Sequence, residues 1–460
     1  MTTVNSNEIL NAFDIYQGHW ERLIWIGAFF AMLFGLSRLP KKKFSFATRV
    51  LMGSGAGTVF GMAVWMVSQM EISPSIMEYK STMAENLGQW FGLVAHGYLS
   101  LFLCVVVPMI FLASIRLVIH TPAEKQVSPL TRWKKRVNTG MVAVSALIAA
   151  CLGLFFQVGL VPETNGEVFQ WSMAEGDGIL NVIAGRIPAG LGLDLVFGNV
   201  VGLFVFGIYI GIAARRMSGK YMDTVKPVFD LVDGAFSVGT SVCKTIIAYK
   251  PMGAAAIMAY LTSCHGWAIL LMLVKMLLVL CLGAVLMLLV QLLLSAIGGV
   301  GPAAFFRAGK AAMVKALKTR SGAACLPEAQ QALAEGLGRN REITDVVSAY
   351  AISSGMQGCG ALFPSMAAVF AIGISNLVMT PVDVILLVAV IALMSYGITD
   401  LPGTATMAEF AAVLGVGMQE AIPGLGAMIA IDPIADVPRT LINVTGCMAN
   451  GIFVERMVRK

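Results

Sequence analysis

Long apolar runs recur along the chain between residues 22 and 455. A helix needs about 20 mostly apolar residues to cross a lipid bilayer. Some runs are longer than this, so those helices are expected to tilt or to extend beyond the bilayer. The runs predict spans at 22–39, 46–70, 88–119, 138–161, 196–214, 229–261, 266–297, 343–376 and 421–455.

Two further apolar segments, about 300–330 and 378–415, differ from simple spans. Each joins two half-length helical pieces through small residues, SGAACLP in the first segment and SYGITDLPGT in the second. Irregular backbone at membrane depth survives only where protein buries it or where it lines a cavity. Paired broken segments in a transporter indicate the binding site. We therefore expect two helical hairpins; the alternative is one loop and one ordinary span.

The composition indicates a membrane protein, because 57% of the residues are hydrophobic and 13% are charged. Soluble domains carry about 25% charged residues. Basic connections such as 41–49 and 120–136 alternate with acidic ones such as 71–86 and 162–195. Since basic residues mark the cytoplasmic side, we expect the N-terminus outside and the C-terminus in the cytoplasm.

Other classes of protein are disfavoured by what the sequence contains. The eight cysteines show neither CxxC nor metal-ligand spacing, and the net charge of +6 follows the membrane topology and indicates no nucleic-acid partner. The N-terminus has no pattern of a removed signal peptide. Because we find no Ser-His-Asp or zinc-hydrolase motif, we expect neither an enzyme nor a bound metal or cofactor. The glycines of GSGAGTVFG at 53–61 predict close helix packing, not a phosphate-binding loop.

The last predicted span carries a polar stripe within IDPIADVPRTLINVTGCMAN, residues 431–450. The spacing of its members puts them within roughly 80° of arc on a helix. A charge at the bilayer centre costs about 3 kcal/mol or more, so this face should meet protein or water. An Arg fork suits a carboxylate and an Asp suits an ammonium, which predicts a zwitterion site; an internal Asp436–Arg439 ion pair is the alternative. The stripe consists of Asp432, Asp436, Arg439, Asn443 and Cys447.

Motifs in the same order resemble those of the dicarboxylate/amino acid:cation symporters, the glutamate-transporter family. The stripe is similar to that family's last transmembrane helix. The resemblance covers residues 46–460, with one additional helix in front at 1–45. The other motifs are YKPMGAAAIMAYL (249–261, fifth helix), TRSGAACLP (319–327, first hairpin tip), SGMQGCGA (354–361, the NMDGT motif) and SYGITDLPG (395–403, second hairpin tip).

The resemblance implies an all-α polytopic membrane protein with about nine transmembrane helices, two re-entrant hairpins and assembly as a homotrimer. In each protomer a scaffold would hold a transport domain that moves as an elevator. The implied divisions are an extra helix at 1–45, scaffold at 46–136 and 162–262, a transport-domain helix at 137–161 and the transport core at 263–460, whose last helix covers 421–455.

The resemblance also implies roles for individual residues. Arg439 would bind a side-chain carboxylate of the substrate, Asp436 its amino group and Asn443 its α-carboxylate. Because the C4-dicarboxylate branch lacks an acid at the position of Asp436, an amino-acid substrate is favoured. The remaining predicted substrate-binding residues are Arg320, Ser321, Gly322, Met356, Thr399 and Thr440.

The cation ligands of the family are altered in this chain. The Asn and Asp of NMDGT are Gly355 and Gln357, and the Asp that ends NVTGD is Cys447. The third helix also lacks a Tyr that one family sodium site uses. Losing carboxylates removes the hard oxygen ligands that such ions prefer. Two sodium sites are therefore expected to be absent or altered, whereas the one formed by the second hairpin can persist near Ser395, Tyr396 and Thr399.

Two carboxylates are candidates for carrying a proton in place of sodium. Asp400 stands where the family has Gly, and Asp432 begins the stripe. The alternative for Asp400 is a helix N-cap or a turn residue facing solvent. Two more charges lie in apolar runs: Lys275, which we expect to snorkel to the outer interface, and Glu409, a candidate for the cavity wall.

Four features resemble the bacterial L-cystine uptake branch of the family: MQGCGALFP, RSxAAxxP, an additional N-terminal helix and no terminal Asp. Cystine has an amino and a carboxylate group at each end, so Arg439 can meet the far carboxylate. We therefore expect a symporter of the bacterial cytoplasmic membrane that imports L-cystine or a related amino acid with H⁺ and/or Na⁺. Alternatives are a glutamate/aspartate or C4-dicarboxylate symporter, a substrate sensor that does not transport, and an anion channel.

Overall fold

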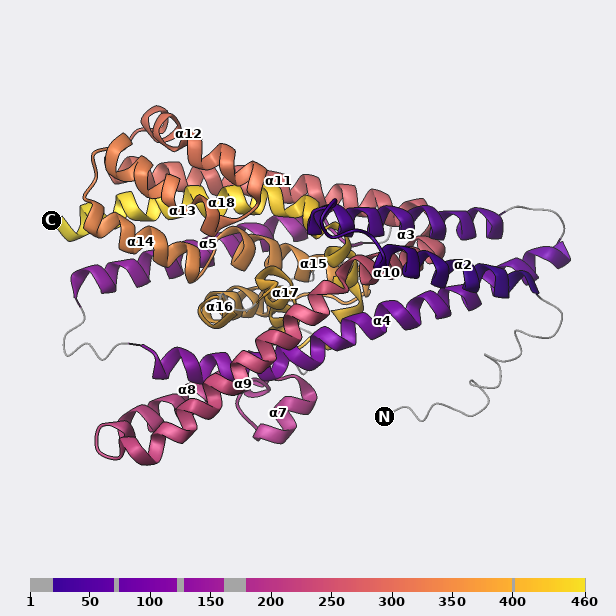
Figure 1. Ribbon diagram of the computed structural model, residues 1–460, viewed down its shortest axis with the longest axis horizontal. Helices are drawn as coiled ribbons and strands as arrows, with labels where there is room; N and C mark the ends of the chain where they lie inside the picture. Colours follow the sequence, from indigo (N-terminus) through magenta and orange to yellow (C-terminus); the bar gives the residue numbers. More distant parts are fainter. Residues whose placement is uncertain (1–19, 70–73, 122–127, 161–178, 399–401, 460) are drawn as a thin grey trace. The chain divides into compact units, whose positions relative to one another are not determined.

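The computed structural model describes residues 20–69, 74–121, 128–160, 179–398 and 402–459 (Figure 1). Eight helical segments among them are long and apolar enough to cross a membrane. The prediction of a polytopic helical membrane protein is thus confirmed. The N-terminal run folds as α2, which is one of the shorter apolar helices.

The regular elements of the described residues are α-helices, short π-helices and one 3₁₀ helix. In chain order they are α2 (Trp20–Ser37), α3 (Phe46–Gln69), α4 (Pro74–Ile119), α5 (Pro129–Phe155), α6 (Ile179–Ala184), α7 (Leu191–Phe197), α8 (Val200–Ser218), α9 (Met222–Ala248), α10 (Lys250–His265), α11 (Trp267–Ile297), α12 (Pro302–Thr319), α13 (Gly322–Gln331), η2 (Ala332–Gly336), α14 (Arg341–Ser353), η3 (Gly358–Leu362), α15 (Phe363–Ile374), α16 (Pro381–Ile398), α17 (Thr404–Val416), η4 (Gln419–Gly424) and α18 (Leu425–Arg459).

The prediction of one span over 229–261 is wrong, because the chain forms two helices there. Helix α9 ends at Ala248, and α10 begins at Lys250 with Pro251 in its first turn. Proline has no N–H and its ring clashes with the carbonyl four residues earlier, so it interrupts a helix but suits a helix start. The apolar composition continues across the break, which hid it from the sequence pattern.

The chain divides into two compact units. Unit 1 comprises residues 1–101, 248–273 and 426–433, and unit 2 comprises 102–247, 274–425 and 434–460. In unit 1, helices α2, α3 and α10 pack against one another. Aromatic rings fill part of this packing, with the ring centroids of Phe29 and Phe91 4.6 Å apart.

Helices α3 and α10 approach so closely that their backbones touch. A Cβ added to Gly53 would overlap the backbone of Pro251, and one added to Gly57 would overlap that of Ala255. The two glycines are four residues apart on α3, and so are Pro251 and Ala255 on α10. One face of α3 therefore packs along one face of α10. This is the close helix packing that GSGAGTVFG predicts.

We expect Gly57→Leu to lower the free energy of unfolding by about 1–3 kcal/mol or more, because the added atoms meet rigid backbone. Gly55→Leu is the matched control, since nothing lies within 4 Å of a Cβ at that exposed position. Thermal unfolding of the purified variants in detergent measures the difference. Equal midpoints for the two variants would contradict the close contact.

In unit 2, helices α5, α15, α16 and α17 and the π-helix η3 pack together, and α12 packs against α13. A second apolar cluster joins α12 and α13 to α18; its members include Phe305, Cys325, Leu333, Cys447 and Met448. These two groups of helices hold the two broken segments and the part of the polar stripe from Asp436 onward.

Each of the two broken segments folds as a pair of packed helices, α12 with α13 and α16 with α17. An ion pair of 2.5 Å between Lys315 Nζ and Glu328 Oε1 joins the arms of the first hairpin. The turn between these arms is shorter than SGAACLP suggests, because Ser321 caps α13 and the helix begins at Gly322. Thr399 and Asp400, in the turn of the second hairpin, lie outside the described residues. Insertion of either hairpin into a bilayer stays a prediction.

Candidate functional site

Arg439 on α18 is the centre of the candidate site in unit 2. Its side chain is only 2% exposed, and Nη2 lies 3.1 Å from Asp436 Oδ1. The guanidinium carbon lies 4.1 Å from the centroid of the Phe363 ring. A buried guanidinium needs such compensation, which here comes from one carboxylate and one aromatic face. The internal ion pair that the sequence left open as an alternative is therefore present.

Asp436 is the more accessible partner, with 28% of its side chain exposed. The same oxygen, Oδ1, accepts a hydrogen bond of 3.3 Å from Thr440 Oγ1 and lies 3.9 Å from the thiol of Cys359. A small cation or ammonium could therefore approach Asp436 from its exposed side, while Arg439 stays covered.

Asn443 joins α18 to the motif SGMQGCGA. Its Oδ1 accepts hydrogen bonds from the backbone N–H of Gly358 at 2.7 Å and of Cys359 at 3.3 Å. Its Nδ2 donates to the sulfur of Cys359 at 3.0 Å and lies 3.7 Å from that of Met356. A Cβ on Gly358 would overlap the backbone of Arg439, so only glycine fits this crossing. Asn443 thus holds the backbone of this motif in place. Its binding of a substrate carboxylate, which the resemblance implies, stays a prediction.

A chain of buried amides surrounds Gln357. Gln291 Nε2 donates to Gln357 Oε1 at 2.7 Å, and Gln357 Nε2 donates to Asn450 Oδ1 at 3.4 Å. Asn450 Nδ2 donates to Asn138 Oδ1 at 3.1 Å, and Asn138 donates to the carbonyl of Ser354. These side chains are at most 2% exposed except Ser354. Each amide is thus paired with a neutral partner, which satisfies buried polar groups without any charge.

The residues predicted for cation coupling do not all lie in one place. Ser395 lies beside Gly355, since a Cβ on that glycine would be 3.5 Å from Ser395 Oγ. The hydroxyl of Tyr396 contacts Thr139. Cys447 is buried in the apolar cluster of unit 2 and donates to the Val444 carbonyl, so it lies among the apolar residues of α18.

Asp432 belongs to unit 1 and forms an ion pair with Lys250 on α10. The side chain of Lys250 is 6% exposed and that of Asp432 is 21% exposed. Of the two other charges in apolar runs, Glu409 on α17 is fully buried, and Lys275 Nζ donates to the Gln157 carbonyl at 3.3 Å.

The tip of the first hairpin is a sharp turn. Arg320 ends α12 in the left-handed conformation, with φ of 52°, and the Ser321 hydroxyl accepts a hydrogen bond from the Ala324 N–H. A Cβ on Gly322 would contact Ile352 of α14, near the end of the helix that leads into Gly355. The tip therefore packs against the helix that leads into the motif that Asn443 contacts, and its contact with a substrate stays a prediction.

Sequence reasoning missed several residues that hold the site together. Phe363, Gln291, Asn138 and Asn450 lie within predicted spans, and Lys250 lies in a motif that was used only for recognition. Polar residues inside apolar spans are expensive and usually face the protein interior, which is the signal that could have found the three amides. Phe363 lies in MQGCGALFP, a motif that was used only for the resemblance.

The described residues include eight candidate membrane spans, and α18 carries the buried Arg439 paired with the partly exposed Asp436, an arrangement that fits a membrane transporter. The sequence model of the sodium:dicarboxylate symporter family matches residues 46–457. The chain belongs to this family. Its class is therefore that of transporters, in agreement with the resemblance seen in the motifs.

Similar proteins carry the name L-cystine uptake protein TcyP. That of Shouchella clausii is 25% identical over 438 residues, which cover 91% of this chain and 90% of the relative. The proteins of Bacillus cereus and Bacillus subtilis are 24% identical over 446 and 448 residues, and the latter alignment covers 94% of this chain and 93% of the relative.

Proposed function

We propose that the protein is a secondary active symporter that imports L-cystine or a closely related amino acid. The single observation that carries this proposal is the buried Arg439 beside the more exposed Asp436. In a transporter family, this pair offers a cation and an anion to one zwitterionic solute. The names of the similar proteins support cystine among the amino acids.

Substrate binding is an exchange of partners in this proposal. The ammonium group of the substrate approaches the exposed side of Asp436 and weakens its hold on Arg439. The guanidinium then binds a carboxylate of the substrate with its planar fork. Thr440, Asn443 and the backbone at 320–322 complete the pocket, with Met356 as an apolar wall. The ring of Phe363 keeps the guanidinium in position during the exchange.

An amino acid is favoured over a dicarboxylate because of charge. A dicarboxylate would bring two negative charges beside Asp436, which is unfavourable at low dielectric. A cystine molecule instead carries an ammonium for Asp436 and a distant carboxylate for Arg439.

For the coupling ion we propose a proton, with or without one sodium ion bound by the second hairpin. The buried amides around Gln357 support this proposal, since their oxygens accept from protein donors and carry no charge. Hard cations prefer anionic oxygen ligands. Asp400 remains the proposed proton carrier, and the ion pair with Lys250 disfavours Asp432, the other candidate. Ser395, Tyr396 and Thr399 are the proposed carbonyl donors to sodium.

The larger assembly follows the family in this proposal. The hairpins re-enter the cytoplasmic membrane, and the protein forms a homotrimer whose transport domains move as elevators. The N-terminus faces outside and the C-terminus faces the cytoplasm, in keeping with the basic connections.

Counterflow in proteoliposomes tests the function. Vesicles preloaded with unlabelled cystine are expected to accumulate radiolabelled cystine without an ion gradient, and aspartate or succinate to exchange far less. Repeating the assay with a sodium gradient and with a pH gradient identifies the driving ion. Binding of cystine without exchange would contradict a transporter and indicate a sensor, and faster exchange of succinate would contradict the proposed substrate.

We expect Asp400→Asn to flatten the dependence of cystine uptake on external pH, because an amide cannot take up a proton. The double variant Lys250→Met/Asp432→Asn, which removes both charges of the ion pair, is expected to keep the wild-type profile, since a carboxylate paired with an ammonium stays ionised. Initial rates of uptake across a pH series check this. If only the double variant has a flat profile, Asp432 and not Asp400 is the proton carrier. Unchanged profiles in both variants would exclude both carboxylates as proton carriers.

A further inference from the structure

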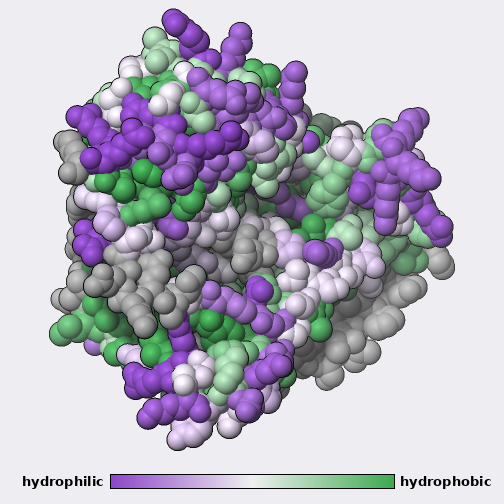
Figure 2. All heavy atoms as spheres, turned by 60° about the vertical axis from the view of Figure 1, so that its left-hand side comes forward, coloured by the Kyte–Doolittle hydropathy of each residue, from purple (hydrophilic) through white to green (hydrophobic). Residues whose placement is uncertain are grey.

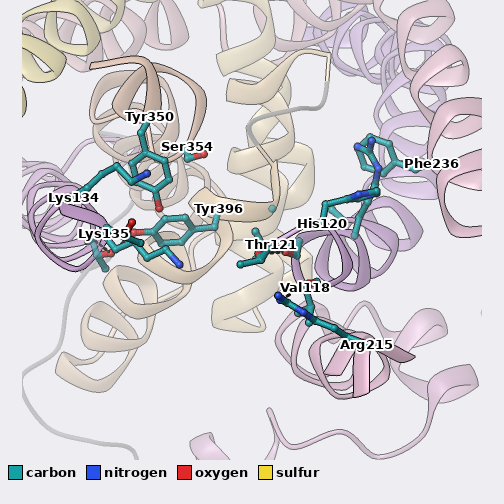
Figure 3. A pocket seen from close by; sticks show the side chains of 16 residues that line it. Val118, His120, Thr121, Lys134, Lys135, Arg215, Phe236, Tyr350, Ser354 and Tyr396 are labelled. Carbon is teal, nitrogen blue, oxygen red and sulfur yellow. Dashed lines mark hydrogen bonds between the residues drawn. The ribbon is translucent and has the colours of Figure 1, made fainter. Parts of the chain in front are cut away.

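A cavity of about 850 Å³ lies within unit 2, away from the Arg–Asp pair (Figure 3). Its walls come from the end of α4, the beginning of α5, the end of α8, and residues of α9, α14 and α16. A volume of this size is in the range of small-molecule sites, which extends over about 300–1,000 Å³. Tyr396 and Ser354, which were described above, also line this cavity, but the family match and the Arg439–Asp436 pair give the cavity itself no role.

The Arg and Lys side chains in the wall give it a positive charge. Among the described residues that line the cavity, none carries a carboxylate, and four are Arg or Lys. These four are Arg116, Lys134, Lys135 and Arg215. Asp233, next to the cavity, pairs with Arg116 at 2.7 Å and also contacts His120. Four cations and this one carboxylate leave a formal charge of +3.

Two of the cations contact neutral groups. Lys134 Nζ lies 4.5 Å from the centroid of the Tyr350 ring, and Arg215 Nη1 donates to the Val118 carbonyl at 3.2 Å. Figure 3 shows Lys134, Tyr350 and Tyr396 on one wall and Arg215 with Thr121 on the other. A carbonyl or a ring attracts a cation but does not neutralise it.

Basic residues gather on the cytoplasmic side of a membrane protein, but this preference alone does not explain why these four line one cavity. The end of α4 and the beginning of α5 lie at the left in Figure 1, and Figure 2, which brings that side forward, shows hydrophilic side chains gathered in several groups. Arg136 and Arg216 belong to the same basic connections, yet they are exposed and do not line the cavity. Their immediate neighbours Lys135 and Arg215 do.

We propose that this cavity binds a phosphate-bearing anion through Arg215, Lys134 and Lys135, with hydroxyl groups of its wall as further donors. Arginine and lysine are the residues that bind phosphate oxygens, and a charge of +3 suits an anion with more than one negative charge. Apolar residues such as Leu117 and Phe236 also line the cavity, so it suits an organic phosphate better than a free inorganic ion. The phosphate comes either from the headgroup of an anionic phospholipid or from a soluble metabolite; basic pockets between membrane helices bind such headgroups.

Binding to the purified full-length protein tests the proposal without any transport assay. One arm titrates ATP and inorganic pyrophosphate as soluble probes into the protein in neutral detergent. The other arm compares thermal unfolding in phosphatidylcholine nanodiscs with and without phosphatidylglycerol. We expect at least one arm to show saturable binding that weakens with added salt. Binding of the soluble probes identifies a metabolite site, and a shift with phosphatidylglycerol alone identifies a headgroup site.

Lys135→Gln and Arg215→Gln are expected to reduce the affinity of the effective probe by at least about tenfold each, since hydrogen bonds to charged groups are lost. Arg136→Gln and Arg216→Gln are the matched controls, with the same change of charge one residue away on the same helices. Unfolding midpoints without ligand verify that the variants are folded, and Lys135 is the safer position because it is exposed. No binding in either arm, or equal losses in test and control variants, would overturn the proposal.

Discussion

Replacing Arg439 by Ala is expected to reduce cystine binding and uptake by more than about 100-fold. Truncating one partner of a buried charge pair in an interface costs about 2–5 kcal/mol, and a tenfold change corresponds to about 1.4 kcal/mol. Arg439→Lys keeps the charge but loses the fork and the flat contact with Phe363, so we expect it to recover little. Radiolabelled uptake and binding to detergent-purified protein measure both variants.

Arg459→Ala is the control for this prediction, because Arg459 lies at the exposed end of the same helix and pairs with Glu455 at 3.3 Å. Its uptake is expected to equal that of the wild type. Because Asp436 is partly exposed, the Arg439 variants should fold, which a thermal unfolding measurement verifies. Wild-type uptake in folded Arg439→Ala would remove the guanidinium from the proposed mechanism and leave the family assignment intact.

The second large effect is expected at the ion pair between Lys250 and Asp432. Asp432→Leu leaves the ammonium of Lys250 buried without its carboxylate, which costs about 3–5 kcal/mol of folding free energy. Lys250→Met should cost less, because the side chain of Asp432 is 21% exposed and keeps some access to water. The double variant Lys250→Met/Asp432→Leu should be more stable than Asp432→Leu, since an apolar pair of similar volume replaces the buried ions.

Thermal unfolding of the three variants measures this coupling as a double-mutant cycle. Arg49→Met, on α3 of the same unit, is a suitable control for the loss of a basic residue near a helix start. If the effects of the two single variants simply add in the double variant, the two charges do not stabilise each other in the membrane protein.

Part of the fold and of the site could be predicted because it depends on local spacing. The stripe on α18 follows from residues three and four apart, and the glycines of α3 followed from their own repeat. The broken segments were recognised because small residues and Pro interrupt apolar runs. These features are written into a few consecutive residues, so a single sequence suffices to find them.

Other features depend on which distant residues meet, and local spacing says nothing about that. Lys250 and Asp432 are 182 positions apart, and neither has a pattern that names its partner. The Cys447 position fits the polar stripe by spacing, yet its side chain lies in the apolar cluster beside Val444 and Met448. The break between α9 and α10 was missed because hydropathy does not register a single proline.

The thiol of Cys359 has a chemical consequence for the proposed cargo. A thiol attacks a disulfide as the thiolate, and cystine is a disulfide. The sulfur of Cys359 lies 3.9 Å from Asp436 Oδ1 and accepts a hydrogen bond of 3.0 Å from Asn443 Nδ2. A cystine whose ammonium group is held by Asp436 would therefore be bound beside a thiol of its own carrier, and the two together have the groups that a mixed disulfide needs.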